Sequence, residues 1–300
     1  MSANDTGNDV GVTRDAAAVD GAAVDGALRA DAATYFPFQL GTPHLIKGGF
    51  AFTEGPVWDL ATNTLLFSDI EADTIYKLDL PSTVTVFRTP SSHFNGLGLD
   101  TNGLLIAAEY SSRSIARTTA NGTIQPLADI YQGKRFNSPN DLTVRSDGTI
   151  YFTDPTFGLQ GTSEVGIQGV YRISPAGPLT LEADSDKSPN GVALSPDENT
   201  LYVAITFENR ILAFDVATDG ATRNPRSFAS VQEPDGICVA PLGRLYVAAK
   251  NNGAGALVVL DSTGASVAVV PITDGPTNCE FGGVAAKTLF ITARVPKTRN

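Results

Sequence analysis

Hydrophobic and polar positions along this chain alternate in short blocks that are typical of β-strands. From Glu54 onward, short runs rich in Val, Ile, Leu, Phe and Tyr are bounded by turns rich in Gly, Pro, Asn and Asp. Hardly any segment shows the 3.6-residue period of an amphipathic helix. The pattern therefore predicts an all-β fold.

A polar residue that opens a strand-like run recurs six times, at intervals of 41, 45, 50, 45 and 43 residues. In each repeat a polar turn and a second apolar strand follow, and most repeats add two further strand-like runs. We call the six polar residues the markers: Glu54, Asn95, Asn140, Asn190, Asp235 and Asn278. A period near 45 residues with four strands per unit predicts a six-bladed β-propeller over residues 35–300. A β-sandwich is disfavoured, because sandwiches do not repeat one motif six times.

The last repeat raises the question of how the ring closes. It ends with the strand-like segment Thr288–Arg294, close to the C-terminus. Pro43–Phe50, upstream of the first marker, is expected to supply its outer strand and so remove an open sheet edge. No third strand is evident for this repeat. We therefore expect either a thin last blade or a C-terminus that is cut short.

Residues 1–34 differ from the rest of the chain, because they are a low-complexity mixture of Ala, Asp and Gly. Such a segment buries too little apolar surface to offset the entropy of ordering, so we expect a disordered tether. Met1 is followed by polar residues, which argues against a signal peptide there. A soluble protein is expected. Export or lipid anchoring would require that an upstream signal has been removed.

Composition narrows the classes of function. Hydrophobic residues make up 42% and charged residues 18% of the chain, which suits a folded core. The net charge of -11 argues against nucleic acid as a partner. No apolar run reaches the length of a membrane span. Cys238 and Cys279 show no metal or redox spacing, so we expect buried free thiols. The oligomeric state stays open.

The markers point to a metal site. In a propeller, equivalent positions on the innermost strands converge at one end of a central channel. Two carboxylates and four amides facing that channel would be costly to desolvate without a partner. A single Asn-Gly pair is usually a turn, so the recurrence carries the argument. One divalent cation is predicted, most favourably Ca²⁺, which takes six to eight oxygen ligands. Mn²⁺, Zn²⁺ and Fe²⁺ stay open, although no marker is His or Cys.

Five motifs resemble the senescence marker protein/gluconolactonase/luciferin-regenerating enzyme family. They are EGPVW at Glu54–Trp58, SPNDL with YFTDP within Ser138–Pro155, SPNG at Ser188–Gly191, PDG at Pro234–Gly236 and TNCEFGG at Thr277–Gly283. The resemblance covers about Leu45 to Arg294. It implies a six-bladed propeller with one divalent cation, usually calcium, in its channel. It also implies hydrolysis of sugar lactones.

Site residues follow from the resemblance position by position. It implies that the metal is held by Glu54, Asn140, Asn190 and Asp235, and that Asp235 is also the catalytic residue. Asn95 falls on a substrate-contacting Asn of the family. His93 stands where some members carry a substrate-binding Arg, which is a departure from the pattern. Glu109 is a further candidate for substrate contact, although acidic residues at strand ends often satisfy backbone amides instead.

The leading hypothesis is a lactonase in which the cation polarises the carbonyl and Asp235 activates water. Two alternatives remain, namely an organophosphate or aryl-ester hydrolase with the same metal cage, and a non-catalytic calcium-binding propeller. The Gly-rich segment Pro155–Gly169 is expected to be either a lid over the site or a plain insertion. No GxSxG, P-loop or HExxH motif is present.

Overall fold

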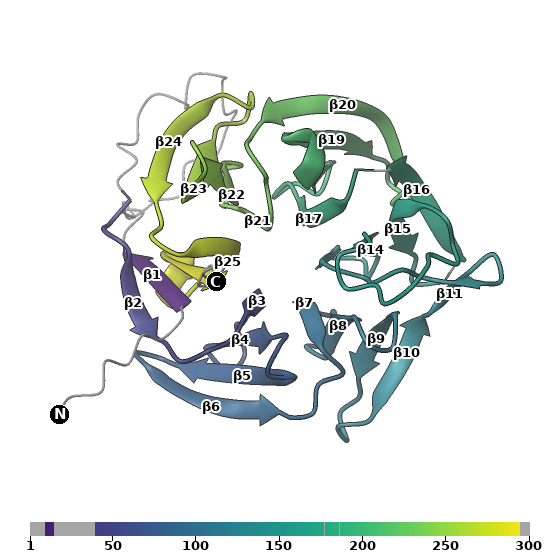
Figure 1. The fold of residues 1–300 in the computed structure, drawn as a ribbon, viewed down its shortest axis with the longest axis horizontal. Helices are drawn as coiled ribbons and strands as arrows, with labels where there is room; N and C mark the ends of the chain where they lie inside the picture. Colours follow the sequence, from purple (N-terminus) through teal and green to yellow (C-terminus); the bar gives the residue numbers. More distant parts are fainter. Residues whose placement is uncertain (1–9, 15–39, 177, 186, 295–300) are drawn as a thin grey trace, which may run out of the picture.

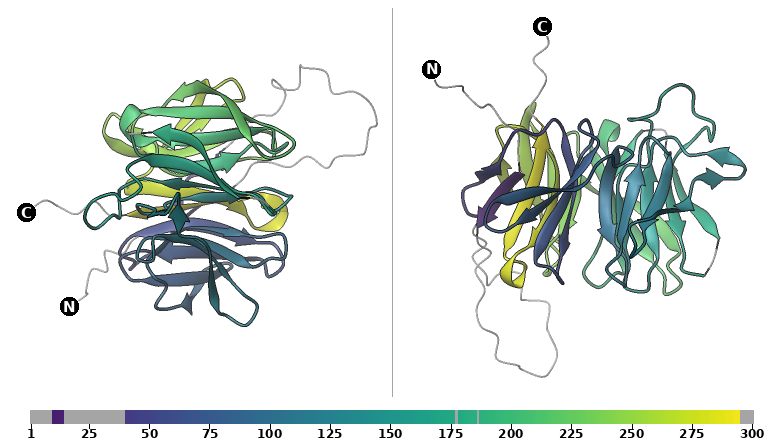
Figure 2. Two further views of the ribbon diagram at one scale, coloured as in Figure 1. Left: turned by 90° about the vertical axis from the view of Figure 1, so that its right-hand side faces the viewer. Right: turned by 90° about the horizontal axis from the view of Figure 1, so that it is seen from below.

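A computed structural model describes residues 10–14, 40–176, 178–185 and 187–294, whose strands surround a common axis (Figure 1). The side views show the sheets standing beside one another around that axis (Figure 2). The prediction of an all-β propeller is confirmed. No helix in the described part of the chain is long and apolar enough to cross a membrane.

The described residues form six four-stranded antiparallel sheets, each of which runs from the axis outward. The first contains β3 (Thr53–Asp59), β4 (Thr64–Asp69), β5 (Thr74–Asp79) and β6 (Thr83–Arg88). The second contains β7 (Phe94–Leu99), β8 (Leu105–Glu109), β9 (Ser114–Thr118) and β10 (Ile124–Ala128). The third contains β13 (Leu142–Val144), β14 (Ile150–Asp154), β15 (Gln168–Ile173) and β16 (Leu179–Ser185).

The other three sheets complete the ring. The fourth contains β17 (Pro189–Leu194), β18 (Thr200–Ile205), β19 (Arg210–Val216) and β20 (Thr222–Ser230). The fifth contains β21 (Ile237–Val239), β22 (Leu245–Asn251), β23 (Ala254–Leu260) and β24 (Ser266–Pro271). The sixth contains β25 (Gly275–Gly282), β26 (Thr288–Arg294), β1 (Val10–Arg14) and β2 (His44–Lys47). A hairpin of β11 (Ile130–Tyr131) and β12 (Lys134–Arg135) and two 3₁₀ turns, η2 (Thr206–Glu208) and η3 (Val284–Ala286), lie between strands.

The two ends of the chain close the ring within the sixth sheet. The outermost strand is β2, as predicted for Pro43–Phe50. The third strand is β1, which pairs antiparallel with β26 from Val10 opposite Thr292 to Arg14 opposite Thr288. The expectation of a thin last blade is therefore wrong, because the missing strand comes from the N-terminal side. Residues 10–14 thus belong to the propeller, and the rest of the predicted tether lies outside the described residues.

Hydrophobic side chains fill the six spaces between neighbouring sheets. Each space holds one cluster of buried residues drawn from both sheets. Between the sixth and first sheets, for example, Trp58 stacks on Phe290 with ring centroids 5.4 Å apart. Because each sheet is covered on both faces, inner strands such as β22 are continuously buried from Leu245 to Ala249. The outer strands face solvent and are mostly exposed.

Cys238 and Cys279 form a disulfide, with their Cα atoms 5.6 Å apart, so the expectation of free thiols is wrong. Both cysteines lie on innermost strands, β21 and β25, of neighbouring sheets. Their separation of 41 residues is close to one repeat, and it therefore brings them to facing positions. The bridge ties the fifth sheet to the sixth, beside the axis.

Removing this bridge should destabilise the protein. Closing a loop of 41 residues in the unfolded chain is worth roughly 2–4 kcal/mol. The double variant Cys238→Ala/Cys279→Ala should therefore unfold in urea with a free energy lower by about that amount. Reductant should lower the wild-type value and leave the variant unchanged. A thiol titration that finds two free thiols in the unfolded, unreduced protein would contradict the bridge.

Candidate functional site

The six markers lie on or beside the innermost strands, and hydrogen bonds between neighbouring sheets connect them in a closed ring. The donor–acceptor distances lie between 2.7 and 3.2 Å. In order, the links are Ser68 Oγ to Asn95 O, Gly96 N to Asn140 O, Thr153 Oγ1 to Asn190 O, Gly191 N to Asp235 O, Gly236 N to Thr277 O and Thr277 Oγ1 to Thr53 O. The ring therefore holds the markers in equivalent places around the axis.

The glycines that follow most markers are explained by this ring rather than by turns. Gly96 lies inside β7, where a Cβ atom would stand 2.7 Å from Asp141 Cα. At Gly236 a Cβ atom would stand 2.1 Å from Asn278 Cγ. Neighbouring backbones approach so closely here that a side chain has no room. The Asn-Gly pairs thus mark contacts between sheets.

Two of the markers are carboxylates that oppose each other electrostatically. Glu54 is buried and Asp235 is partly buried. Burial raises the pKa of Glu54 well above its ordinary value, and the charges of Asp235 and Asp141 raise this pKa further. Burial also raises the pKa of Asp235 to about 7, although Arg294 and a hydrogen bond from Asn190 oppose the shift. Ionising both groups is costly, so the pair favours a cation between them.

In three of the marker amides, the nitrogen atom donates a hydrogen bond to a hydroxyl group. Asn95 Nδ2 and Asn140 Nδ2 donate to Tyr110 Oη at 2.7 and 2.8 Å. Asn190 Nδ2 donates to Thr206 Oγ1 at 3.1 Å. No described residue donates a hydrogen bond to Oδ1 of Asn95 or Asn140. These amide oxygens are therefore free to accept a hard cation or a ligand proton.

The six markers are a mixture of two carboxylates and four amides. Across the described residues, no group of three or more His, Cys, Asp and Glu side chains is arranged to hold a metal ion. A cation at the markers would accordingly depend on amide oxygens as well as on Glu54 and Asp235. Oxygen ligands of this kind suit calcium better than zinc or copper.

Both the nitrogen and the oxygen of the sixth marker amide, Asn278, form hydrogen bonds. Its Nδ2 donates to Asp141 Oδ2 at 3.3 Å, and its Oδ1 accepts from Cys279 N at 2.8 Å. Asp141, Asn278 and Glu280 line a cavity of about 180 Å³ along the axis. Burial raises the pKa of Asp141 to about 6 and that of Glu280 to about 8. Asn278 therefore belongs to the wall of this inner cavity.

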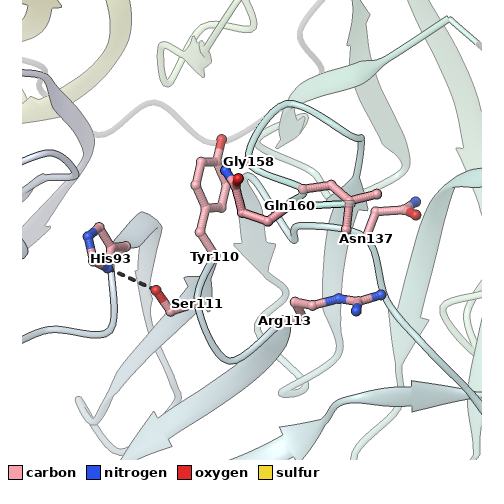
Figure 3. A pocket seen from close by; sticks show the side chains of 8 residues that line it. His93, Tyr110, Ser111, Arg113, Asn137, Gly158 and Gln160 are labelled. Atoms are coloured by element: carbon pink, nitrogen blue, oxygen red, sulfur yellow. Dashed lines mark hydrogen bonds between the residues drawn. The ribbon is translucent and has the colours of Figure 1, made fainter. Parts of the chain in front are cut away.

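A second cavity, of about 380 Å³, opens beside the markers between the second and third sheets. Figure 3 shows Tyr110, which lines the cavity, between His93 and Ser111 on one side and Arg113 and Asn137 on the other. Gly158, Leu159 and Gln160, from the segment expected to be either a lid or an insertion, complete the wall. That segment therefore covers part of the cavity.

His93 lies in this cavity wall, where a substrate contact was predicted. Ser92 and His93 both have positive φ angles, of 67° and 53°. Asp73 Oδ1 holds this backbone by accepting hydrogen bonds from Ser91 N at 3.0 Å and His93 N at 2.7 Å. The imidazole Nδ1 is 2.8 Å from Ser111 Oγ, so Ser111 hydrogen-bonds to this nitrogen and not to Nε2. The substrate contact itself stays a prediction.

The substrate contact predicted for Glu109 stays a prediction, and the structure shows which groups this side chain holds. Its Oε2 accepts hydrogen bonds from the hydroxyls of Ser112 and Ser114, and it is not among the residues that line the cavity of Figure 3. Asp69 and Asp154, at the same position in their sheets, accept backbone N–H groups from the segments before their markers. Asp69 and Asp154 therefore fix the backbone before their markers, whereas Glu109 holds two side-chain hydroxyls.

Sequence reasoning missed Tyr110, Thr206 and Arg294. Tyr110 and Thr206 each follow the second strand of their sheet directly, so they are equivalent positions in two repeats. A hydroxyl-bearing residue at that position was the available signal. Arg294, at the end of β26, lowers the pKa of both Glu54 and Asp235 through its charge.

The fold and the site define a β-propeller with an oxygen-rich polar site where its innermost strands converge. Residues 52–294 match the SMP-30/Gluconolactonase/LRE-like region, and the chain belongs to this family. The recognised resemblance is thereby confirmed.

Named relatives agree with this assignment. A gluconolactonase of Zymomonas mobilis is 31% identical over 291 residues, covering 85% of this chain and 80% of the relative. Regucalcin of Xenopus laevis is 27% identical and covers 83% of this chain and 85% of its own length. The solved structure of XC5397 from Xanthomonas campestris, described as a gluconolactonase, superposes with a TM-score of 0.73 at 36% identity. That match covers 81% of this chain and 86% of the other.

The raised pKa of Glu280 predicts how stability depends on pH. The folded value of about 8 lies above the ordinary value of 4.5. The contribution of neutral Glu280 is therefore complete below about pH 4.5 and is lost as pH rises through about 8. In chelator, thermal unfolding midpoints from pH 5 to 9 should fall more steeply for wild type than for Glu280→Gln. Replacement of exposed Glu71 by Gln is the control, and parallel curves for wild type and Glu280→Gln would contradict the prediction.

Proposed function

We propose that this protein is a divalent-cation-dependent lactonase that hydrolyses a small sugar-acid lactone. The observation that carries the proposal is the convergence of two buried or partly buried carboxylates, Glu54 and Asp235, with amide groups whose nitrogens are tied back. A cavity of about 380 Å³ whose wall carries His93, Arg113 and Gln160 adjoins them, at the lower end of the usual range for small ligands. The gluconolactonase names of two relatives support the reaction class.

The residues present fit a hard cation. Glu54, Asn140, Asn190 and Asp235 would hold it, with Ca²⁺ favoured by an all-oxygen donor set. The cation would supply Lewis acidity toward the lactone carbonyl. Its charge would also compensate the repulsion between Glu54 and Asp235, which otherwise raises the pKa of Glu54.

Asp235 acts as the general base. Its carboxylate takes a proton from water as the water oxygen bonds to the carbonyl carbon of the lactone. The bond between that carbon and the ring oxygen then breaks, and the ring oxygen receives the proton from Asp235. The product is the open-chain hydroxy acid, and Asp235 returns to its ionised form. A pKa of about 7 in the metal-free site suits such proton exchange, and a bound cation favours the ionised form.

Asn95 and His93 orient the substrate in this proposal. Asn95 presents an amide oxygen beside the cation ligands, and His93 extends the polar wall into the adjoining cavity. An imidazole in place of a guanidinium offers fewer donors, so the hydroxyl groups of the substrate are held by neighbours such as Gln160 as well. Glu109 accepts the hydroxyls of Ser112 and Ser114 through Oε2, and its contact with substrate stays a prediction.

Replacing the base should separate chemistry from binding. At saturating Ca²⁺, Asp235→Asn should lower kcat on glucono-δ-lactone by about 100- to 10,000-fold. Asp261→Asn, in an exposed turn of the same sheet, is the matched control and should keep wild-type turnover. Acid release at constant pH measures both. Near-wild-type kcat in Asp235→Asn with the cation bound would disprove the assignment of the base.

Cation removal decides between the proposed lactonase and its alternatives. Acid release should be followed on gluconolactone, other aldonolactones and a phosphotriester, before and after chelation. Lactone hydrolysis that chelator abolishes and Ca²⁺ restores is the expected result. Faster turnover of the phosphotriester would favour an organophosphate or aryl-ester hydrolase. Ca²⁺ binding with no turnover of any substrate would favour a calcium-binding propeller.

A further inference from the structure

Tyr110 places a single hydroxyl within hydrogen-bond distance of two marker amides. Its oxygen accepts from Asn95 Nδ2 at 2.7 Å and from Asn140 Nδ2 at 2.8 Å. Asn95 belongs to the second sheet, whereas Asn140 precedes the first strand of the third. Tyr110 itself follows β8 directly. One phenol oxygen therefore joins two neighbouring sheets at the level of the markers.

In this arrangement both amides turn their nitrogen toward Tyr110 and their oxygen away from it. A phenol has two acceptor lone pairs and a single proton. If both amides turned over, two Oδ1 atoms would face Tyr110 Oη, and the phenol could donate to only one of them. If only one amide turned over, the phenol could donate to its Oδ1, but that oxygen would then face Tyr110 instead of the site. The observed orientation is the one in which both amides donate to the phenol. It leaves both Oδ1 atoms without a donor from any described residue.

The tyrosine ring is itself held by the segment that covers the cavity. A Cβ atom at Gly158 would stand 2.4 Å from Tyr110 Cδ2, so the backbone of that segment lies directly on the ring. Gly158 N donates to Ser138 Oγ at 3.1 Å, and Arg113 forms an ion pair with Glu164 at 2.7 Å. The segment is anchored at both places, which restricts the ring from swinging away from the amides.

We infer that Tyr110 is a positioning residue that orients Asn140 and Asn95 toward the cation and substrate, and that Gly158 acts on the site through the Tyr110 ring. The inference rests on the cation site of the proposed function. Partners that orient a metal ligand usually matter, because their loss costs about 10- to 100-fold in metal affinity. Tyr110 would achieve this without touching the cation.

The decisive variant is Tyr110→Phe, which keeps the ring under Gly158 and removes only the hydroxyl. Calorimetric titration of the metal-free protein with Ca²⁺ should give a Kd raised about 10- to 100-fold. At saturating Ca²⁺, kcat on gluconolactone should recover most of its wild-type value. The control is Tyr171→Phe, because Tyr171 is fully buried and its hydroxyl has no partner among the described residues. Its Kd should equal that of wild type.

The outcomes separate the inference from the proposed function. A Tyr110→Phe variant with the wild-type Kd, in a protein that binds Ca²⁺ and hydrolyses lactone, overturns the inference alone. A raised Kd in a protein that hydrolyses no lactone supports the inference and overturns the lactonase. A wild-type protein that binds no divalent cation overturns both.

The role of Gly158 is tested by a double-mutant cycle. Gly158→Ala should displace the Tyr110 ring and raise the Kd for Ca²⁺, whereas Thr162→Ala, exposed on the same segment, should not. Because the effect passes through the Tyr110 hydroxyl, adding Gly158→Ala to Tyr110→Phe should cause little further loss. Strictly additive effects on binding free energy would show that the segment acts independently of Tyr110.

Discussion

The closed ring of hydrogen bonds between innermost strands is the constraint on which the rest of the structure depends. Its last link, from Thr277 Oγ1 to Thr53 O, joins the end of the chain to the first repeat, and Thr53 Oγ1 in turn donates to Ala293 O at 2.7 Å. Each marker is thereby fixed by two neighbouring sheets. A site built in this way is preorganised, because the backbone at or next to each marker takes part in a link.

This constraint can be recognised in the sequence. A backbone that approaches its neighbour closely needs glycine, so Gly96 and Gly236 follow their markers for a reason that repeats in four of the six sheets. The repeat therefore predicted the propeller, the innermost strands and the position of β2. Where Asp141 replaces the glycine, its carboxylate accepts from Leu142 N and Val192 N. The exception thus keeps a contact between the same neighbouring sheets.

Features that arise from contacts between different repeats were harder to predict from the sequence. The strand β1 is separated from β2 by a long stretch of chain, and its pairing with β26 follows from the open edge rather than from its own pattern. Cys238 and Cys279 looked unpaired because their spacing was compared with metal and redox motifs instead of with the repeat. Tyr110 was missed because its role depends on Asn140, which belongs to another repeat.

The ring and the loops contribute different things to the site. The ring places the carboxylates and amides that would hold a cation, and its geometry is fixed by backbone amides and by the hydroxyls of Ser68, Thr153 and Thr277. The cavity wall comes from connecting segments, which carry His93, Arg113 and Gln160. Loops tolerate change better than the elements that they connect. The cavity wall can therefore vary while the arrangement of the markers stays constant. Tyr110 is the point where the two parts meet, because its hydroxyl accepts from two marker amides and its side chain lines the cavity.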